Sequence, residues 1–133
     1  MSTAPEPITL EQVREWCTTA ARACWEKGGE DTVILSVGRT LSITDAFVIT
    51  SGSTPRMVRP MAEEVEEKIK QAGGPAPRRI EGLDDARWVL MDYGDFVVHL
   101  LLSEAREFDQ LDRLWSDAER WEWEVPEVRA AGE

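Results

Sequence analysis

Two aspartates in the segment Asp92-Tyr93-Gly94-Asp95 are the residues whose type and spacing come nearest to catalytic chemistry. Carboxylates that flank a turn can hold Mg²⁺ together with the oxygens of a phosphate. Ser51-Gly52-Ser53 follows an apolar run, so its backbone N–H groups could bind a phosphate at the start of a helix. Together the two segments would suit metal-dependent chemistry on a phosphate-bearing substrate.

The pattern nevertheless stops short of a nucleotidyltransferase site. Such enzymes follow a Gly-Ser pair with two metal-binding aspartates spaced as Asp-x-Asp, and no Asp-x-Asp occurs in this sequence. Aspartates at the ends of a turn, and Ser, Thr and Gly residues that cap a helix, explain the same residues without catalysis. We therefore expect no active site, no metal and no other cofactor.

The single histidine and the two cysteines also lack the partners that chemistry would need. His99 lies in the apolar run DFVVHLLL, and no Ser or Cys motif offers a nucleophile for it to activate. Cys17 and Cys24 fall on one helix face about 10 Å apart, which is too far for a disulfide. We expect a structural histidine and two buried thiols in a reducing compartment, and no zinc site.

Charge is the outstanding feature of the composition. The 133 residues include 26 acidic and 15 basic side chains, for a net charge of -11. Binding to DNA or RNA requires a basic face that neutralises phosphates, and an anionic membrane surface would also repel this chain. A basic protein is the more suitable partner. No apolar run is long enough to span a membrane, and the acidic N-terminus resembles no targeting signal, so we expect a cytoplasmic, most simply bacterial, protein.

Hydrophobic spacing predicts the elements that must position these residues. A capping box at Thr9 opens a helix that ends at Gly28. A second helix runs to about Ala72, and Pro60 requires either a later start of this helix or a kink. The predicted strands cover 32–37, 46–50, 78–81, 87–92 and 95–102.

This order of elements predicts a mixed α/β (α+β) domain of two to three layers around a five-stranded sheet. The strand–helix–strand step around the second helix favours a parallel crossover, and the last two strands form a hairpin with Tyr93-Gly94 as its link. We divide the chain into a flexible lead, 1–8, a folded domain, 9–118, and an acidic, partly disordered tail, 119–133.

The strand before the hairpin has large apolar side chains on both faces. One face carries Trp88, Leu90 and Asp92, and the other carries Val89, Met91 and Tyr93. If only one face belongs to the core, the other is an exposed aromatic and acidic patch that suits a basic protein partner. Burial of both faces is the alternative, and periodicity does not separate the two.

Three longer motifs occur in order: SITDAFVITSG (42–52), EGLDDARWVLMDYGDFVVHLL (81–101) and REFDQLDRLWSDA (106–118). Together they resemble the ribosomal silencing factor family, also called Iojap or RsfS. The resemblance extends over about 9–118, and the combination of the three motifs is specific to this family.

The resemblance implies a nucleotidyltransferase-like fold that has lost its catalytic aspartates, and a homodimer in the free state. It implies a non-enzymatic function, in which the protein binds a protein of the large ribosomal subunit, L-fourteen, where the two subunits meet. A protein bound there blocks joining of the small subunit and represses translation, typically in nutrient limitation or stationary phase. The acidic charge adds the expectation of little contact with ribosomal RNA.

By motif position, the resemblance places the partner contact on Trp88, Leu90, Asp92, Tyr93 and Asp95. The carboxylates would pair with Lys or Arg of the ribosomal protein, and the two aromatic rings would supply contact area. On the sequence, two other functions stay open: a Mg²⁺-dependent enzyme that uses Asp92 and Asp95, and an adaptor for another basic protein.

Four positions depart from the residues common in the family. Ala46 and Asp109 stand where Tyr is frequent, so aromatic bulk is missing from any contact made there. Met57 stands where His is common, and Pro60 where a helix former is common.

Overall fold

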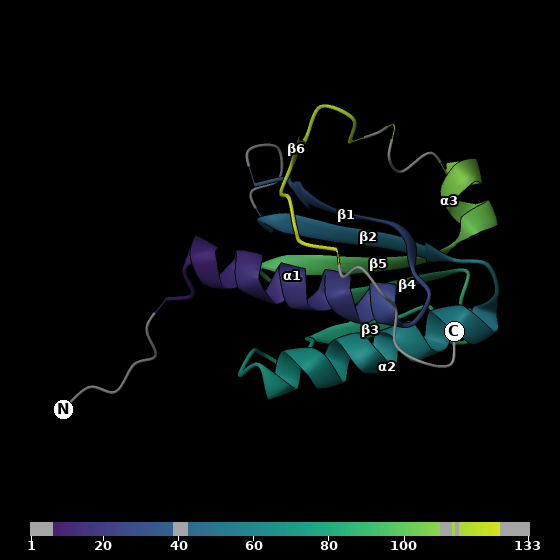
Figure 1. Ribbon diagram of the computed structural model, residues 1–133, viewed down its shortest axis with the longest axis horizontal. Coiled ribbons are helices and arrows are strands. Elements are labelled where there is room, and N and C mark those ends of the chain that lie inside the picture. The colour runs from purple at the N-terminus through teal and green to yellow at the C-terminus, as the bar shows by residue number, and fades with distance from the viewer. Residues whose placement is uncertain (1–6, 39–42, 110–112, 114, 126–133) are drawn as a thin grey trace.

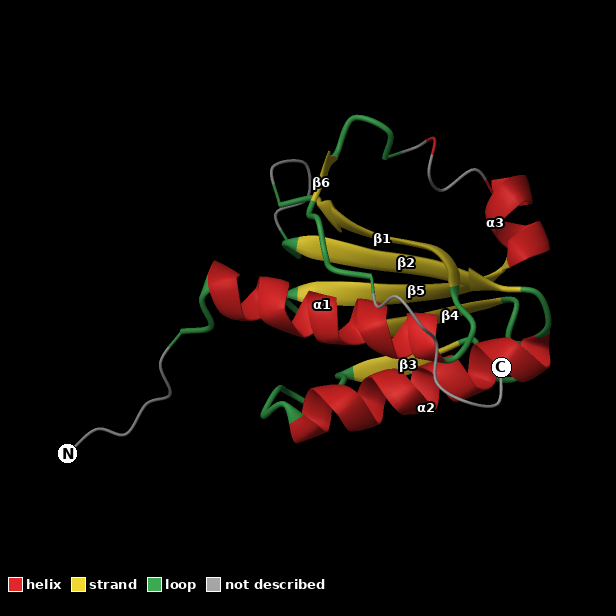
Figure 2. Ribbon diagram, viewed as in Figure 1, coloured by secondary structure: helices red, strands yellow, loops and turns green. Residues whose placement is uncertain are grey.

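The computed structural model describes residues 7–38, 43–109, 113 and 115–125. Helices α1 and α2 lie side by side on one face of a single sheet, and α3 lies apart from them after β5 (Figure 1). Figure 2 shows the same arrangement by type of element. The elements are α1 (Leu10–Glu26), β1 (Glu30–Ser36), β2 (Ala46–Gly52), α2 (Pro55–Gln71), β3 (Arg79–Glu81), β4 (Trp88–Asp92), β5 (Phe96–Leu102), α3 (Ser103–Asp109) and β6 (Glu119–Arg120).

The sheet is mixed, as predicted, but it has six strands in the order β3-β4-β5-β2-β1-β6. β2 and β5 are parallel neighbours, and all other neighbours are antiparallel. The prediction of five strands missed β6, a two-residue strand inside the expected tail. Glu119 and Arg120 carry no strand signal of their own, and they become a strand only by pairing with the outer edge of β1. The relation to the nucleotidyltransferase fold stays a prediction.

α1 begins with the predicted capping box. The Thr9 hydroxyl accepts from the Gln12 amide at 3.1 Å, and the Thr9 amide donates to the Gln12 side chain at 3.0 Å. The apolar stripe of the helix, which includes Cys17 and Cys24, is buried against the sheet and α2. Both cysteines are free, and burial raises the pKa of the Cys24 thiol to about 12. They act as small core residues, as the spacing predicted.

α2 runs without a late start from Pro55, with Pro60 inside the helix. Thr54 caps it, since its hydroxyl accepts from the Met57 amide at 3.3 Å, and Pro55 occupies the first helical position, where its fixed φ is favourable. Pro60 removes one backbone hydrogen bond. The buried residues Val58, Met61, Val65 and Ile69 hold the helix on the sheet despite that loss. None of the helices in the described ranges has the length and apolar character needed to cross a bilayer.

The hairpin between β4 and β5 turns one residue later than predicted. The Tyr93 amide donates to the Phe96 carbonyl at 3.0 Å, so these two residues close the ladder and Gly94-Asp95 forms the link. Gly94 has φ +85°, the conformation that a tight hairpin requires at its first link residue. Tyr93 continues the alternation of the strand, on the face of Val89 and Met91, as predicted.

Residues 119–125 of the predicted tail pack against the fold. The Trp121 amide donates to the Ile34 carbonyl at 2.9 Å, and its ring is 6% exposed within the core on the side of α1. The Arg14 guanidinium lies over this ring at 5.0 Å, and the Trp123 indole donates to the Thr32 carbonyl at 3.3 Å. The folded region therefore extends beyond Ala118. Most of the expected lead (1–6) and the rest of the tail (126–133) lie outside the described residues.

We predict that Trp121→Ala lowers the free energy of unfolding by about 3 kcal/mol, because it leaves a cavity between β1 and α1. Glu124→Ala is the matched control, since this neighbouring side chain is 87% exposed and contributes only a surface ion pair with Arg22 at 3.8 Å. Urea denaturation of both variants measures the difference. Equal stability of the two variants would show that this segment does not seal the edge of the sheet.

Candidate functional site

The pleat of β4 separates its side chains into a helix-covered face and an open face. Val89 and Met91 are fully buried in the core that α1 and α2 build. Trp88, Leu90 and Asp92 alternate with them, remain partly exposed and face away from those helices. The sequence left open whether both faces are buried, and the structure shows that this second face is only partly covered.

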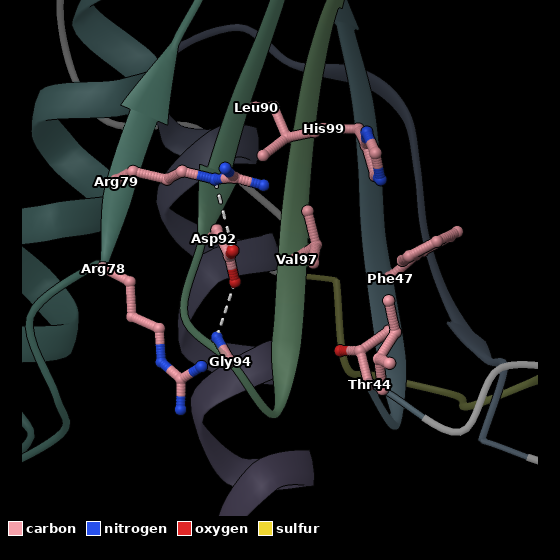
Figure 3. A pocket seen from close by; sticks show the side chains of 10 residues that line it. Thr44, Phe47, Arg78, Arg79, Leu90, Asp92, Gly94, Val97 and His99 are labelled. Atoms are coloured by element: carbon pink, nitrogen blue, oxygen red, sulfur yellow. Dashed lines mark hydrogen bonds and ion pairs between the residues drawn. The ribbon is translucent and has the colours of Figure 1, made fainter.

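Register extends the open face across the neighbouring strands. Asp92 pairs with Val97 and Leu90 with His99 on β5, and Val97 in turn pairs with Phe47 on β2. Over β1 and β2 the face is covered by Trp115 and Ala118, and the Trp115 and Phe47 rings meet edge to face at 5.2 Å. Over β4 and β5 the described residues leave a hollow of about 350 Å³. Its lining residues are Ile43, Thr44, Phe47, Arg78, Arg79, Leu90, Asp92, Gly94, Val97 and His99 (Figure 3).

We call this cavity the β4–β5 hollow. Its walls are largely apolar and its rim is charged. Leu90, Val97 and Phe47 supply apolar walls from three adjacent strands, as Figure 3 shows. At the rim, one Asp92 oxygen accepts from the Gly94 amide at 2.8 Å, and the other lies 3.5 Å from Arg79 Nε. Asp92 therefore stabilises the turn through one carboxylate oxygen and presents the other at the mouth of the hollow.

Trp88 is tied to the hollow through His99. The indole Nε1–H of Trp88 donates to His99 Nδ1 at 3.0 Å, and the Phe47 ring meets the imidazole edge to face at 4.6 Å. Burial lowers the pKa of His99 to about 4, so the imidazole is neutral at physiological pH. A neutral imidazole that accepts at Nδ1 carries its proton on Nε2. The predicted structural role of His99 fits this geometry.

Of the five predicted contact residues, the structure brings Trp88, Leu90 and Asp92 together and separates the other two. Tyr93 lies on the helix-covered face, is 4% exposed and stacks on Phe96 with ring centroids 4.7 Å apart. A ring this deeply buried has little surface to offer a partner, and its role in the partner contact stays a prediction. Asp95 lies in the link outside the lining of the hollow, where its carbonyl accepts from the Asp45 amide at 2.9 Å.

Sequence reasoning missed the residues that β2 and the preceding loop bring to the hollow, namely Phe47, Ile43 and Thr44. β2 and β5 are parallel neighbours, although paired residues such as Phe47 and Val97 are 50 positions apart and α2, β3 and β4 lie between the two strands in the chain. No local pattern reveals such a pairing. The one available signal was Ile43, an isoleucine next to polar residues, which the structure leaves 84% exposed.

The residues considered for phosphate or metal chemistry have structural partners. Ser51 is buried, and its hydroxyl donates to the Glu30 carbonyl at 3.1 Å. The Arg106 guanidinium donates to the same carbonyl at 3.3 Å and to the Ser51 hydroxyl at 3.4 Å. Within the described residues, no group of three His, Cys, Asp or Glu side chains is placed to hold a metal ion.

Comparison with known proteins gives consistent results. The model of the family described as ribosomal silencing factor during starvation matches residues 10–133. A ribosomal silencing factor RsfS of Bacillus subtilis is 36% identical over 99 residues, which cover 74% of this chain and 83% of that protein. A mouse protein named mitochondrial assembly of ribosomal large subunit protein 1 is 32% identical over 68% of this chain and 41% of its own length.

A crystal structure of a Chromobacterium violaceum protein resembles the fold with a TM-score of 0.74 and 29% identity, and the match covers 90% of this chain and 96% of that one.

We predict that His99 makes stability depend on pH. Its pKa is 6.5 when unperturbed and about 4 in the folded protein, so between these values the unfolded chain binds a proton that the folded protein does not. The contribution of a neutral His99 to the free energy of unfolding is complete above about pH 6.5 and falls by about 3 kcal/mol by about pH 4.

Urea denaturation of wild type and His99→Asn at neutral and acidic pH measures this effect. The Asn amide oxygen can still accept from Trp88, and carboxylate titrations common to both proteins cancel in the difference. The stability of wild type should fall toward that of the variant, or below it, as the pH drops. A difference that is independent of pH would show that the histidine is protonated equally in the folded and unfolded chains.

Proposed function

The chain belongs to the ribosomal silencing factor family of regulatory, non-enzymatic proteins, and from this premise we propose that it represses translation by binding the large ribosomal subunit. In this proposal the contact is made with ribosomal protein L-fourteen, and the bound protein sterically blocks association of the subunits. The observation that carries the proposal is the open face of β4 with its apolar β4–β5 hollow.

The open face has the composition of a protein-binding surface. Leu90 and Val97 are partly exposed beside each other on β4 and β5, and Ile43 is almost fully exposed at the mouth of the hollow. A contiguous apolar area rimmed by polar groups is typical of a site that another protein covers. The side chains of this face stand on the hydrogen-bonded ladder of β2, β5 and β4, which fixes their backbone before a partner binds.

Charge supports a basic protein partner over RNA. The net charge of -11 is unfavourable near ribosomal RNA phosphates. At the mouth of the hollow, Asp92 lies among Arg78 and Arg79 and pairs with Arg79 at 3.5 Å. A Lys or Arg of the ribosomal protein would share this carboxylate, whose side chain is 23% exposed, with Arg79. The proposal therefore includes little contact with rRNA. It also keeps the expected cytoplasmic location and the homodimer that the family resemblance implies for the free protein.

The large subunit, and not the small one, is the partner that the comparisons favour. The mouse relative is named for assembly of the ribosomal large subunit. Asp92, which the enzymatic alternative would use, caps the turn and pairs with Arg79, and the described residues hold no group of three acidic, His or Cys side chains that could bind a metal ion. An adaptor for another basic protein is tested by the same experiment, because it would leave subunit joining unchanged.

We expect the purified protein to lower the joined-ribosome peak when it is mixed with separated subunits before sucrose-gradient centrifugation. The protein should migrate with the large subunit. A heat-denatured sample at the same concentration serves as the control for non-specific effects. An unchanged joined-ribosome peak at saturating protein would contradict steric blocking, and absence of the protein from the large-subunit fractions would contradict the partner.

Leu90→Ala should weaken large-subunit binding by about tenfold or more, because this side chain forms a wall of the hollow that the partner fills. Leu83→Ala is the matched control, since Leu83 is a 39% exposed leucine outside the lining of the hollow. Both variants should unfold at similar urea concentrations. Equal affinities in a pelleting assay would remove the open face from the contact.

A further inference from the structure

Two buried polar atoms in the β4–β5 hollow lack hydrogen-bond partners. The Thr44 hydroxyl and His99 Nε2 have none within the part of the chain that the structure describes. Thr44 is 7% exposed and His99 5% exposed, and both residues line the hollow. Proteins rarely leave such atoms unpaired, because removing a polar group from water without a replacement bond is costly.

The chemistry of the two atoms defines what would satisfy them. His99 Nδ1 already accepts from Trp88, so Nε2 carries the proton and is a donor. The Thr44 hydroxyl can donate as well. His99 Nε2 therefore requires an acceptor, the Thr44 hydroxyl can use one, and neither atom carries a charge.

The walls and the rim indicate that the acceptor is uncharged and part of a larger apolar group. Phe47, Leu90 and Val97 surround the polar atoms, and burying a carboxylate or phosphate among them would be costly. At the mouth, Asp92 at 3.5 Å and Glu81 at 3.9 Å already balance the charge of Arg79, and the Arg78 guanidinium lies beside Gly94 at the turn. A volume of about 350 Å³ is small, and it suits one side chain with its adjoining peptide group.

We infer that the β4–β5 hollow receives one residue of the protein partner, whose apolar side chain fills the hollow while oxygen atoms of the partner accept from Thr44 at one end of the hollow and from His99 at the other. This inference rests on the proposed function, since it assigns the chemistry of recognition to the same surface. Ile43 would then cover the inserted residue from the loop side. The buried donors would supply specificity for an uncharged acceptor.

Thr44→Val tests the inference with little change in shape. The variant keeps a branched side chain and removes the hydroxyl, so we expect large-subunit binding to weaken about fivefold to tenfold. The stability of the free protein should be unchanged or higher, because a buried polar atom without a partner is lost. Ser103→Ala is the matched control, since the Ser103 hydroxyl is also buried without a described partner but lies outside the lining of the hollow.

A second measurement follows the imidazole itself. Nitrogen-15 NMR of wild type should show His99 protonated at Nε2, and addition of the isolated ribosomal protein should shift the Nε2–H signal and slow its exchange with water. If the variant proves unstable, this measurement alone decides the question. An unshifted signal at saturation, or equal weakening by Thr44→Val and Ser103→Ala, would overturn the inference. If wild type binds neither the subunit nor the ribosomal protein, the proposed function fails instead.

Discussion

The parallel pairing of β2 with β5 is the contact on which the rest of the molecule depends. It joins the β1–β2 hairpin to the β4–β5 hairpin, and all seven residues of β2 are buried as a result. On one face, this junction supports α1 and α2. On the other, it places Phe47 beside Val97 and thereby completes the hollow that β4 and β5 alone would leave open on one side.

The sequence was sufficient for features that depend on local patterns. Thr9 and Gln12 predicted the start of the first helix, and the alternation of Trp88, Leu90 and Asp92 placed three predicted contact residues on one face. The same alternation placed Tyr93 on the opposite face with Val89 and Met91, where the structure has it. Its prediction as a contact residue came from motif position alone, to which strand alternation contributes nothing. The contributions of Ile43, Thr44 and Phe47 depend on a nonlocal parallel pairing, for which hydrophobic periodicity has no signal.

The two faces of β4 divide stability from recognition. Val89 and Met91 belong to a closed core, whereas Leu90 and Asp92 face a hollow with apolar walls, a charged rim and the polar atoms of Thr44 and His99. His99 connects the two functions, because the same imidazole holds the Trp88 indole and carries the donor in the hollow. A substitution at His99 therefore affects both folding and recognition, whereas one at Thr44 leaves the ladder and the core unchanged.

The outermost strands have a consequence for the behaviour of many copies in a crowded solution. β3 is three residues long and carries Arg79 and Glu81, and β6 is only two residues long, Glu119 and Arg120. Short, charged outer strands offer little template for another chain to extend the sheet, so this geometry opposes fibre growth. An acidic protein with a partly exposed apolar surface thus gains protection from self-assembly at the edges of its sheet.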